Sequence, residues 1–202
     1  PDIKDCISYL RSRGINKKDV WYFKLGTCSS GKFRRRVIVP SFNAEGELNY
    51  FSARSIDESS GFKYLNSKSR KTEIIFNEIN IDWSSELAIV EGPFDLFKCN
   101  QNSTCLLGSN LRTDSYLFKK IVSNKTPILL ALDSDMRDKS AKIADLLSSY
   151  NCDVRIMDLS GYSDVGEMSK IDFNRLRLSA VPWSRESSLM QKISSIQTGS
   201  LI

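Results

Sequence analysis

The chain has 202 residues, 41% of them hydrophobic and 26% charged, with a net charge of +5, which is the composition of an ordinary globular protein. It contains no histidine, which excludes Ser–His and Cys–His nucleophiles and histidine metal sites. No apolar run is long enough to span a membrane, and no signal-peptide pattern begins the chain. We therefore expect a cytoplasmic protein without a membrane partner. The five cysteines form no C-x-x-C pair, so we expect free thiols and no zinc in this chain.

Positive charge is concentrated in the first part of the chain. Residues 1–80 contain 15 Lys and Arg against 9 Asp and Glu, whereas residues 81–202 contain 14 against 15. This imbalance favours a polyanionic partner held beside a carboxylate site, although uneven surface charge also occurs without such a partner. The densest basic cluster leads directly into an apolar run and consists of Lys32, Arg34, Arg35 and Arg36.

The first 80 residues predict a mixed α+β unit. Apolar side chains recur at helical spacing over residues 2–13, and a second short helix is expected over 17–23. Residues 36–40 and 48–54 predict two strands of a hairpin. The pattern changes near residues 79–85, so we expect an N-terminal subdomain over residues 1–82.

The following residues alternate between predicted strands and helices. The expected strands cover 87–90, 104–107, 128–132 and 152–157, and the expected helices begin at Pro93 or cover 113–123 and 137–150. Such alternation predicts a parallel sheet covered by helices, in which ligands bind at the carboxyl ends of the strands. We therefore expect an α/β protein with a parallel-sheet subdomain over 83–175 and a helical or flexible tail over 176–202.

Carboxylates follow three of these four strands at their carboxyl ends. They are Glu91 and Asp95 after the first strand, Asp133 and Asp135 after the third, and Asp164 and Glu167 after the fourth. Pro93 suits the first position of a helix, which would place Asp95 in its first turn. An extended Asp133-Ser134-Asp135 segment would direct both aspartates to one side.

Carboxylates gathered at one edge of a sheet repel one another unless a cation neutralises them. Oxygen ligands select Mg²⁺ or Mn²⁺ over zinc. Each acid alone has another interpretation, as a favourable charge at a helix start, an N-cap or a capping-box residue. Their joint occurrence at successive strand ends favours a metal site.

Two groups of motifs resemble a known family. Glu91-Gly92-Pro93-Phe94-Asp95, followed by Asp133-Ser134-Asp135, resembles the Toprim domain. Ahead of it, the Arg36–Pro40 strand, Arg54 and Lys63-Tyr64-Leu65-Asn66-Ser67 resemble the RNA-polymerase core of bacterial and phage DNA primases. The resemblance runs collinearly over about residues 1–175.

This resemblance implies the synthesis of short RNA primers on a single-stranded DNA template from NTPs. It implies a Toprim parallel-sheet α/β subdomain, with Glu91, Asp95, Asp133 and Asp135 as catalytic residues. The implied ligands of Mg²⁺ or Mn²⁺ are Glu91, Asp133, Asp135 and Asp164. The implied nucleotide-binding residues are Arg54, Lys63, Tyr64 and Asn66, and those implied for DNA are Lys32, Arg34, Arg35 and Arg36. Members of this family also commonly contact a replicative helicase.

Alternatives remain at both the residue and the protein level. Tyr64 could belong to the core, Lys63 could lie over an aromatic surface, and Arg34 and Arg35 could form a solvated edge. The same carboxylates could serve a Toprim metal-dependent nuclease with Glu91 as general base. A non-catalytic nucleic-acid-binding module with a residual metal site is the third interpretation.

Overall fold

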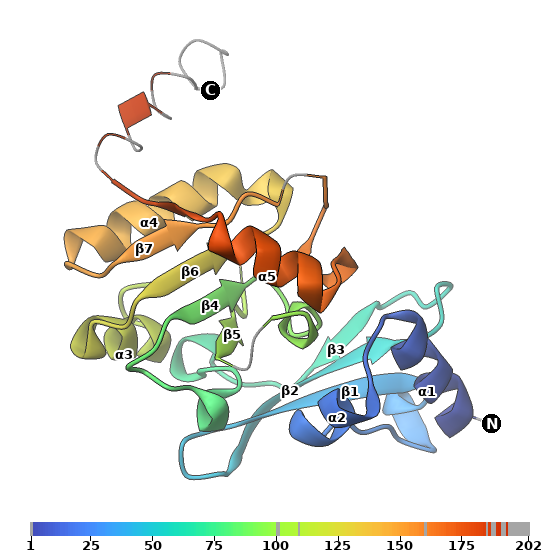
Figure 1. The fold of residues 1–202 in the computed structure, drawn as a ribbon. Helices are drawn as coiled ribbons and strands as arrows, with labels where there is room; N and C mark the ends of the chain where they lie inside the picture. The colour runs from blue at the N-terminus through green and yellow to red at the C-terminus, as the bar shows by residue number, and fades with distance from the viewer. Residues whose placement is uncertain are drawn as a thin grey trace.

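The computed structural model describes residues 2–99, 102–108, 110–159 and 161–184, and the single residues 186, 189, 190 and 193. Its strands form two sheets, one with the order β1-β2-β3 and one with the order β5-β4-β6-β7-β8 (Figure 1). This architecture confirms the predicted α/β fold class. Within the described ranges, no helix is long and apolar enough to cross a membrane.

The first sheet and two helices form the N-terminal lobe. Its elements are α1 (Asp2–Ser12), α2 (Lys17–Tyr22), β1 (Arg36–Phe42), β2 (Leu48–Ser55) and β3 (Tyr64–Asn66). All strand pairs in this sheet are antiparallel, so the predicted hairpin is confirmed. The sequence sets the start of α2 through a capping box, in which Asn16 accepts from the backbone of Lys18 and Asp19 and the Asp19 side chain accepts from Asn16.

The second sheet is parallel except for its last strand. Its strands are β4 (Leu87–Val90), β5 (Ser103–Cys105), β6 (Ile128–Ala131), β7 (Val154–Ile156) and β8 (Val181–Pro182). Its helices are α3 (Tyr116–Asn124), α4 (Arg137–Ser149) and α5 (Lys170–Leu178). The central strands β4 and β6 are buried on both faces, which explains their continuous apolar sequences.

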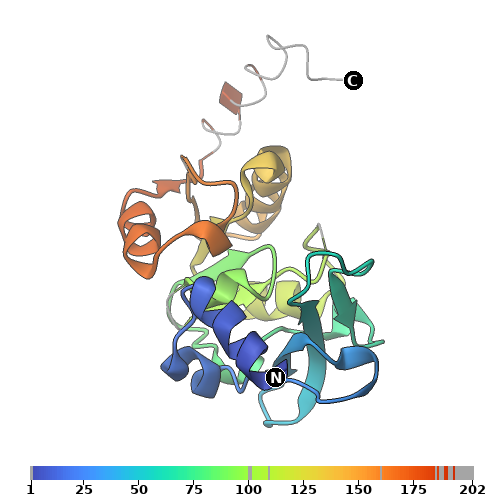
Figure 2. The same cartoon turned by 90° about the vertical axis from the view of Figure 1, so that its right-hand side faces the viewer.

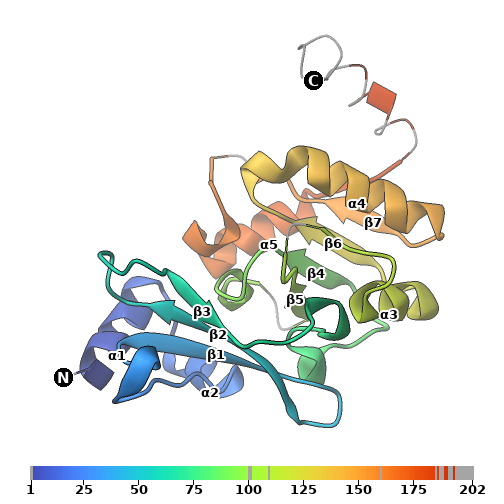
Figure 3. The same cartoon turned by 180° about the vertical axis from the view of Figure 1, so that it is seen from behind.

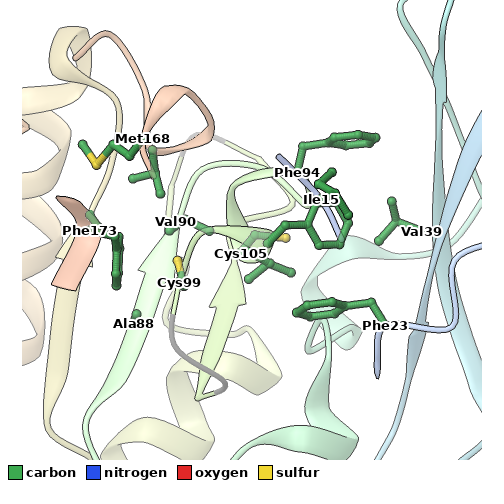
Figure 4. Packing of buried hydrophobic residues seen from close by; sticks show 14 of the residues in the cluster. Ile15, Phe23, Val39, Ala88, Val90, Phe94, Cys99, Cys105, Met168 and Phe173 are labelled. Atoms are coloured by element: carbon green, nitrogen blue, oxygen red, sulfur yellow. The ribbon is translucent and has the colours of Figure 1, made fainter. Parts of the chain in front are cut away.

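Alternate residues of β4 enter two separate hydrophobic cores. Leu87 and Ile89 pack with α3 and α4 on one face, whereas Ala88 and Val90 pack with Phe173 of α5 on the other (Figure 2). The core that contains Ala88 and Val90 continues into the N-terminal lobe. There it includes Phe94, Ile15, Phe23 and Val39 (Figure 4). Both lobes therefore share one hydrophobic core, which fixes the position of the first sheet against the second (Figure 3).

The structure contradicts the predicted backbone conformation of two short segments. The described residues after Pro93 form only a 3₁₀ helix, Asp95–Phe97, instead of the expected α-helix. Ser134–Met136 is likewise a 3₁₀ helix rather than extended chain, because the Met136 N–H bonds back to the Asp133 carbonyl over 2.8 Å. Burial of the strands could be predicted from sequence, but these tight turns depend on contacts with other segments.

The subdomain boundaries expected from sequence stay predictions. The helix α5 crosses position 175, and β8 pairs with β7 beyond it. The expected tail over 176–202 is described only at residues 176–184 and at the single residues 186, 189, 190 and 193.

Candidate active site

Three predicted carboxylates meet at the carboxyl ends of β4 and β6. These strands are neighbours, with Val90 opposite Ala131, so Glu91 and Asp133 emerge at the same edge of the sheet. The 3₁₀ helix after Asp133 adds Asp135 to them. One carboxylate oxygen from each of these three acids lies within 4.8 Å of the others. We call Glu91, Asp133 and Asp135 the acidic group.

The acidic group fits a hard divalent cation. One carboxylate oxygen of Asp133, Oδ1, is buried and has no hydrogen-bond partner in the described part of the chain. Burial, together with the neighbouring charges of Asp95 and Glu91, raises the pKa of Asp133 well above its ordinary value. A buried oxygen without a donor, surrounded by like charges, is the environment that a cation such as Mg²⁺ relieves.

Asp95 lies beside the acidic group in a closely packed turn. Its carboxylate accepts the Gly92 N–H over 2.8 Å, which fixes the loop that carries Glu91. Burial raises the pKa of Asp95 to about 6. A Cβ atom at Gly166 would lie 2.9 Å from the Asp95 carboxylate and 3.1 Å from that of Asp164, so only glycine fits between these two acids.

Asp164 caps a short helix close to the acidic group. It is the N-cap of the 3₁₀ helix Val165–Glu167, and its side chain accepts the Glu167 N–H over 2.9 Å. The Glu167 carboxylate accepts the Ser163 N–H in return. The structure therefore confirms the capping interpretation of Asp164. Because Asp164 also lines the same cavity as Glu91 and Asp133, its expected role as a metal ligand stays a prediction.

A cavity of about 560 Å³ joins the two lobes at this point. Its lining includes five carboxylates, namely Glu91, Asp95, Asp133, Asp164 and Glu167. It also includes five cations, namely Arg13, Arg54, Lys63, Lys71 and Lys98. A negatively charged ligand with a bound cation would meet both kinds of partner in one cavity.

Arg54 is the best-fixed cation of this cavity. It is only 8% exposed, and its guanidinium donates to the Tyr64 hydroxyl. The guanidinium carbon lies 4.8 Å from the centre of the Phe94 ring and 5.3 Å from that of Tyr64. Aromatic contacts hold an arginine without neutralising it, and no ion pair of Arg54 is present among the described residues.

The other residues predicted to bind nucleotide line the same cavity. Lys63 and Asn66 are exposed at its edge, and Tyr64 is half-buried between Arg54 and Phe94. Burial raises the pKa of Tyr64, so its hydroxyl stays protonated at neutral pH. The structure therefore brings these predicted residues and the acidic group to one site, although Tyr64 also serves to support Arg54.

The prediction that the basic cluster ahead of β1 contacts DNA needs correction at Arg36. Arg36 is 7% exposed, and its guanidinium donates to the carbonyls of Ala53, Lys63 and Phe62. It therefore stabilises the first sheet from inside and is not free to contact a template.

The neighbours of Arg36 are also occupied by contacts within the protein. Arg34 pairs with Asp2, and Arg35 pairs with Asp2, Asp5 and Asp57. Lys32 stays exposed beside Phe33. A sequence count of positive charges could not show these partners, because they come from α1 and from the loop after β2.

Sequence reasoning missed three cations of the cavity: Arg13, Lys71 and Lys98. Lys71 follows Lys68 and Arg70, a basic run that could have indicated a charged surface. Lys98 lies one turn after Asp95. Arg13 reaches the site only because α1 packs against the loop after β4, which no local pattern shows.

The fold and the acidic group define an α/β protein with three converging carboxylates at the carboxyl ends of neighbouring parallel strands. No protein-family model matches the chain. The DNA primase of Mycoplasma genitalium is 28% identical over 180 residues, which are 83% of this chain and 29% of that relative. The chain thus spans less than a third of the length of this curated relative.

Solved structures show the same fold. The zinc-binding and RNA polymerase domains of the Aquifex aeolicus primase match with a TM-score of 0.72 and 24% identity, covering 87% of this chain and 56% of that one. A primase catalytic domain bound to single-stranded DNA matches with a TM-score of 0.74 and 18% identity, covering 96% and 76%. The resemblance to bacterial-type DNA primases is therefore confirmed, and the chain has the fold of a primase catalytic core.

Proposed function

We propose that this chain is a DNA primase core that synthesises short RNA primers on single-stranded DNA. The observation that carries the proposal is the shared cavity, which Glu91 and Asp133 of the acidic group line together with Arg54, Lys63 and Asn66. The likeness to DNA primases in sequence and fold supports it. In the reaction a 3′-hydroxyl oxygen bonds to the α-phosphorus of an NTP, and the bond to the bridging oxygen breaks to release pyrophosphate.

Glu91, Asp133 and Asp135 would hold one or more Mg²⁺ or Mn²⁺ ions through their carboxylate oxygens. Such an ion neutralises phosphate charge and makes a hydroxyl a better nucleophile. The buried Oδ1 of Asp133 is the oxygen in greatest need of a cation, because nothing in the described part of the chain donates to it. Asp95 positions Glu91 through its bond to the Gly92 N–H.

The cations that line the cavity would bind the phosphates of the nucleotide. Arg54 is preorganised because its contacts with Tyr64 and Phe94 fix the guanidinium before a ligand arrives. Lys63 and Lys71 are exposed at the same cavity, where they would contact the triphosphate or the template backbone. No histidine is required for this chemistry, since fixed charges supply the stabilisation.

The test is incubation of the chain with a single-stranded DNA template, four NTPs and Mg²⁺, followed by separation of labelled products. We expect short RNA products that disappear when Asp133→Asn is used. The matched control is Asp153→Asn, which makes the same charge change at the exposed residue before β7, at the opposite end of the sheet. Absence of RNA products from the folded wild type, with Mg²⁺ and with Mn²⁺, would refute the proposal.

The same incubation separates the competing functions. A Toprim nuclease would shorten the template in a manner that needs the acidic group, and a binding module would retain the template without new products. The helicase expected as a partner is a further proposal. It would contact the tail over 182–202, of which only a few residues are described.

A further inference from the structure

A second cavity lies next to the candidate active site. Its volume is about 530 Å³, and it lies between the end of α1, the 3₁₀ helix Val165–Glu167 and the start of α5. The two cavities share four lining residues, namely Arg13, Lys98, Gly166 and Glu167. Because a Cβ atom at the shared residue Gly166 would meet the carboxylates of Asp95 and Asp164, the second cavity lies close to these two acids of the first.

Positive charge dominates this second cavity. Its charged lining residues are Arg13, Lys98 and Lys170 against the single carboxylate of Glu167. The first cavity, by contrast, has equal numbers of cations and carboxylates in its lining. A ligand of the second cavity should therefore be an anion that does not need a bound cation of its own.

Lys98 is the central residue of this cavity. It is only 8% exposed, and its ammonium donates to the Arg13 carbonyl over 2.6 Å. A Cβ atom at Gly14 would lie 3.1 Å from this ammonium, so glycine leaves room for it at the end of α1. Burial, together with the nearby charges of Arg13 and Lys170, lowers the pKa of Lys98, whereas the charge of Asp19 acts in the opposite direction.

Lys170 and Arg13, the other two cations of this cavity, differ in whether a carboxylate neutralises them. Lys170 pairs with the buried Asp19. Arg13 lies over the ring of Tyr9 at 5.6 Å and has no ion pair among the described residues. A buried ammonium with further donors and an arginine held by an aromatic ring are typical partners of a phosphate group.

We propose that the second cavity binds a diphosphate group through Arg13 and Lys98, beside the place where nucleotidyl transfer would release pyrophosphate. The inference rests on the proposed function. The diphosphate is carried either by free pyrophosphate as it leaves or by the end of a bound NTP. In both cases the cations that line this cavity would attract the negative charge of the diphosphate.

The test measures equilibrium binding of inorganic pyrophosphate to the full chain in the presence of a metal chelator. It needs no turnover, so a failure of RNA synthesis does not affect its outcome. Wild type and Asp133→Asn should bind pyrophosphate equally, because this site does not use the acidic group. Arg13→Gln should weaken binding about tenfold, the expected loss for one charge-assisted contact. Lys98→Met tests the second contact, with circular dichroism to confirm folding.

The matched control is Arg11→Gln, which makes the same change at an exposed arginine of α1 that lines neither cavity. It should leave pyrophosphate binding unchanged. ATP is a second probe that distinguishes the two sources. If Arg13→Gln weakens the binding of pyrophosphate alone, the site takes the leaving group. If it weakens the binding of both probes, the site takes the triphosphate end of an NTP. Equal affinity of wild type and Arg13→Gln for pyrophosphate, or binding that is lost in chelator, would overturn the proposal.

Discussion

The basic cluster ahead of β1 and the acidic group differ in how far the fold neutralises their charges. The basic cluster of Arg34, Arg35 and Arg36 is neutralised by ion pairs or buried on main-chain carbonyls. The acidic group at the ends of β4 and β6 has like charges for neighbours and a buried oxygen without a donor. Charge density in a sequence is therefore a poor guide to the charge that stays uncompensated after folding.

The largest expected effect concerns the acidic group, whose charges are not compensated within the fold. Asp133→Asn should reduce primer synthesis by about 100- to 1000-fold, the usual loss when a group that stabilises developing charge is removed. Above pH 8, where the Asp133 carboxyl is ionised, the same change should raise the melting temperature of the metal-free protein, because it removes a like charge from the acidic group. Primer assays and thermal melts with and without Mg²⁺ measure both effects. A normal yield from this variant would break the assignment.

The spacing between the acids is the next feature to test. Gly166→Ala places a methyl group 2.9 Å from the Asp95 carboxylate, so Asp95 and the loop with Glu91 must shift. We expect about a 10- to 100-fold loss of activity, because small displacements at a reacting centre are costly. The control is Gly61→Ala, where a Cβ atom meets nothing within 4 Å. Equal activity of the two variants would contradict the packing argument.

The success of sequence reasoning at the acidic group has a simple cause. Fully apolar strands such as 87–90 and 128–132 predict parallel neighbours, and parallel neighbours end at the same edge of the sheet. The positions of Glu91 and Asp133 therefore follow from local patterns alone. The motif that resembles primases added Arg54 and Lys63, which the fold brings to the same cavity.

The failures have a common cause as well. Whether a charge is free depends on partners distant in sequence, such as Asp57 for Arg35 and the carbonyl of Arg13 for Lys98. The short 3₁₀ turn after Pro93 likewise reflects packing of Phe94 and Phe97 against the N-terminal lobe. Such long-range contacts leave no periodic signal in the sequence.

In the basic cluster, where the charges are compensated within the fold, we expect a substitution to reduce stability and not binding. Arg36→Met should lower the free energy of unfolding by about 2–4 kcal/mol, because the carbonyls of Ala53 and Phe62 lose their donor inside the fold. Denaturant unfolding measures this change. The matched variant is Lys63→Gln, which should retain stability and weaken binding to single-stranded DNA with a smaller salt dependence. The opposite pattern would restore the basic cluster as the template site.

The smallest effect concerns the exposed ion pairs of Arg35. Its guanidinium holds the pKa of Asp57 below the ordinary value, and Arg34 does the same for Asp2. A lowered carboxyl pKa in the folded state stabilises the fold at pH values above the unfolded pKa of 3.8, and this contribution disappears as the pH falls through the lowered value. Arg35→Gln should therefore melt at a slightly lower temperature than wild type at pH 6. The difference should shrink both in strong acid and in high salt, because salt screens exposed pairs. A difference that persists under both conditions would show that Arg35 supports the fold through its packing and not through its charge.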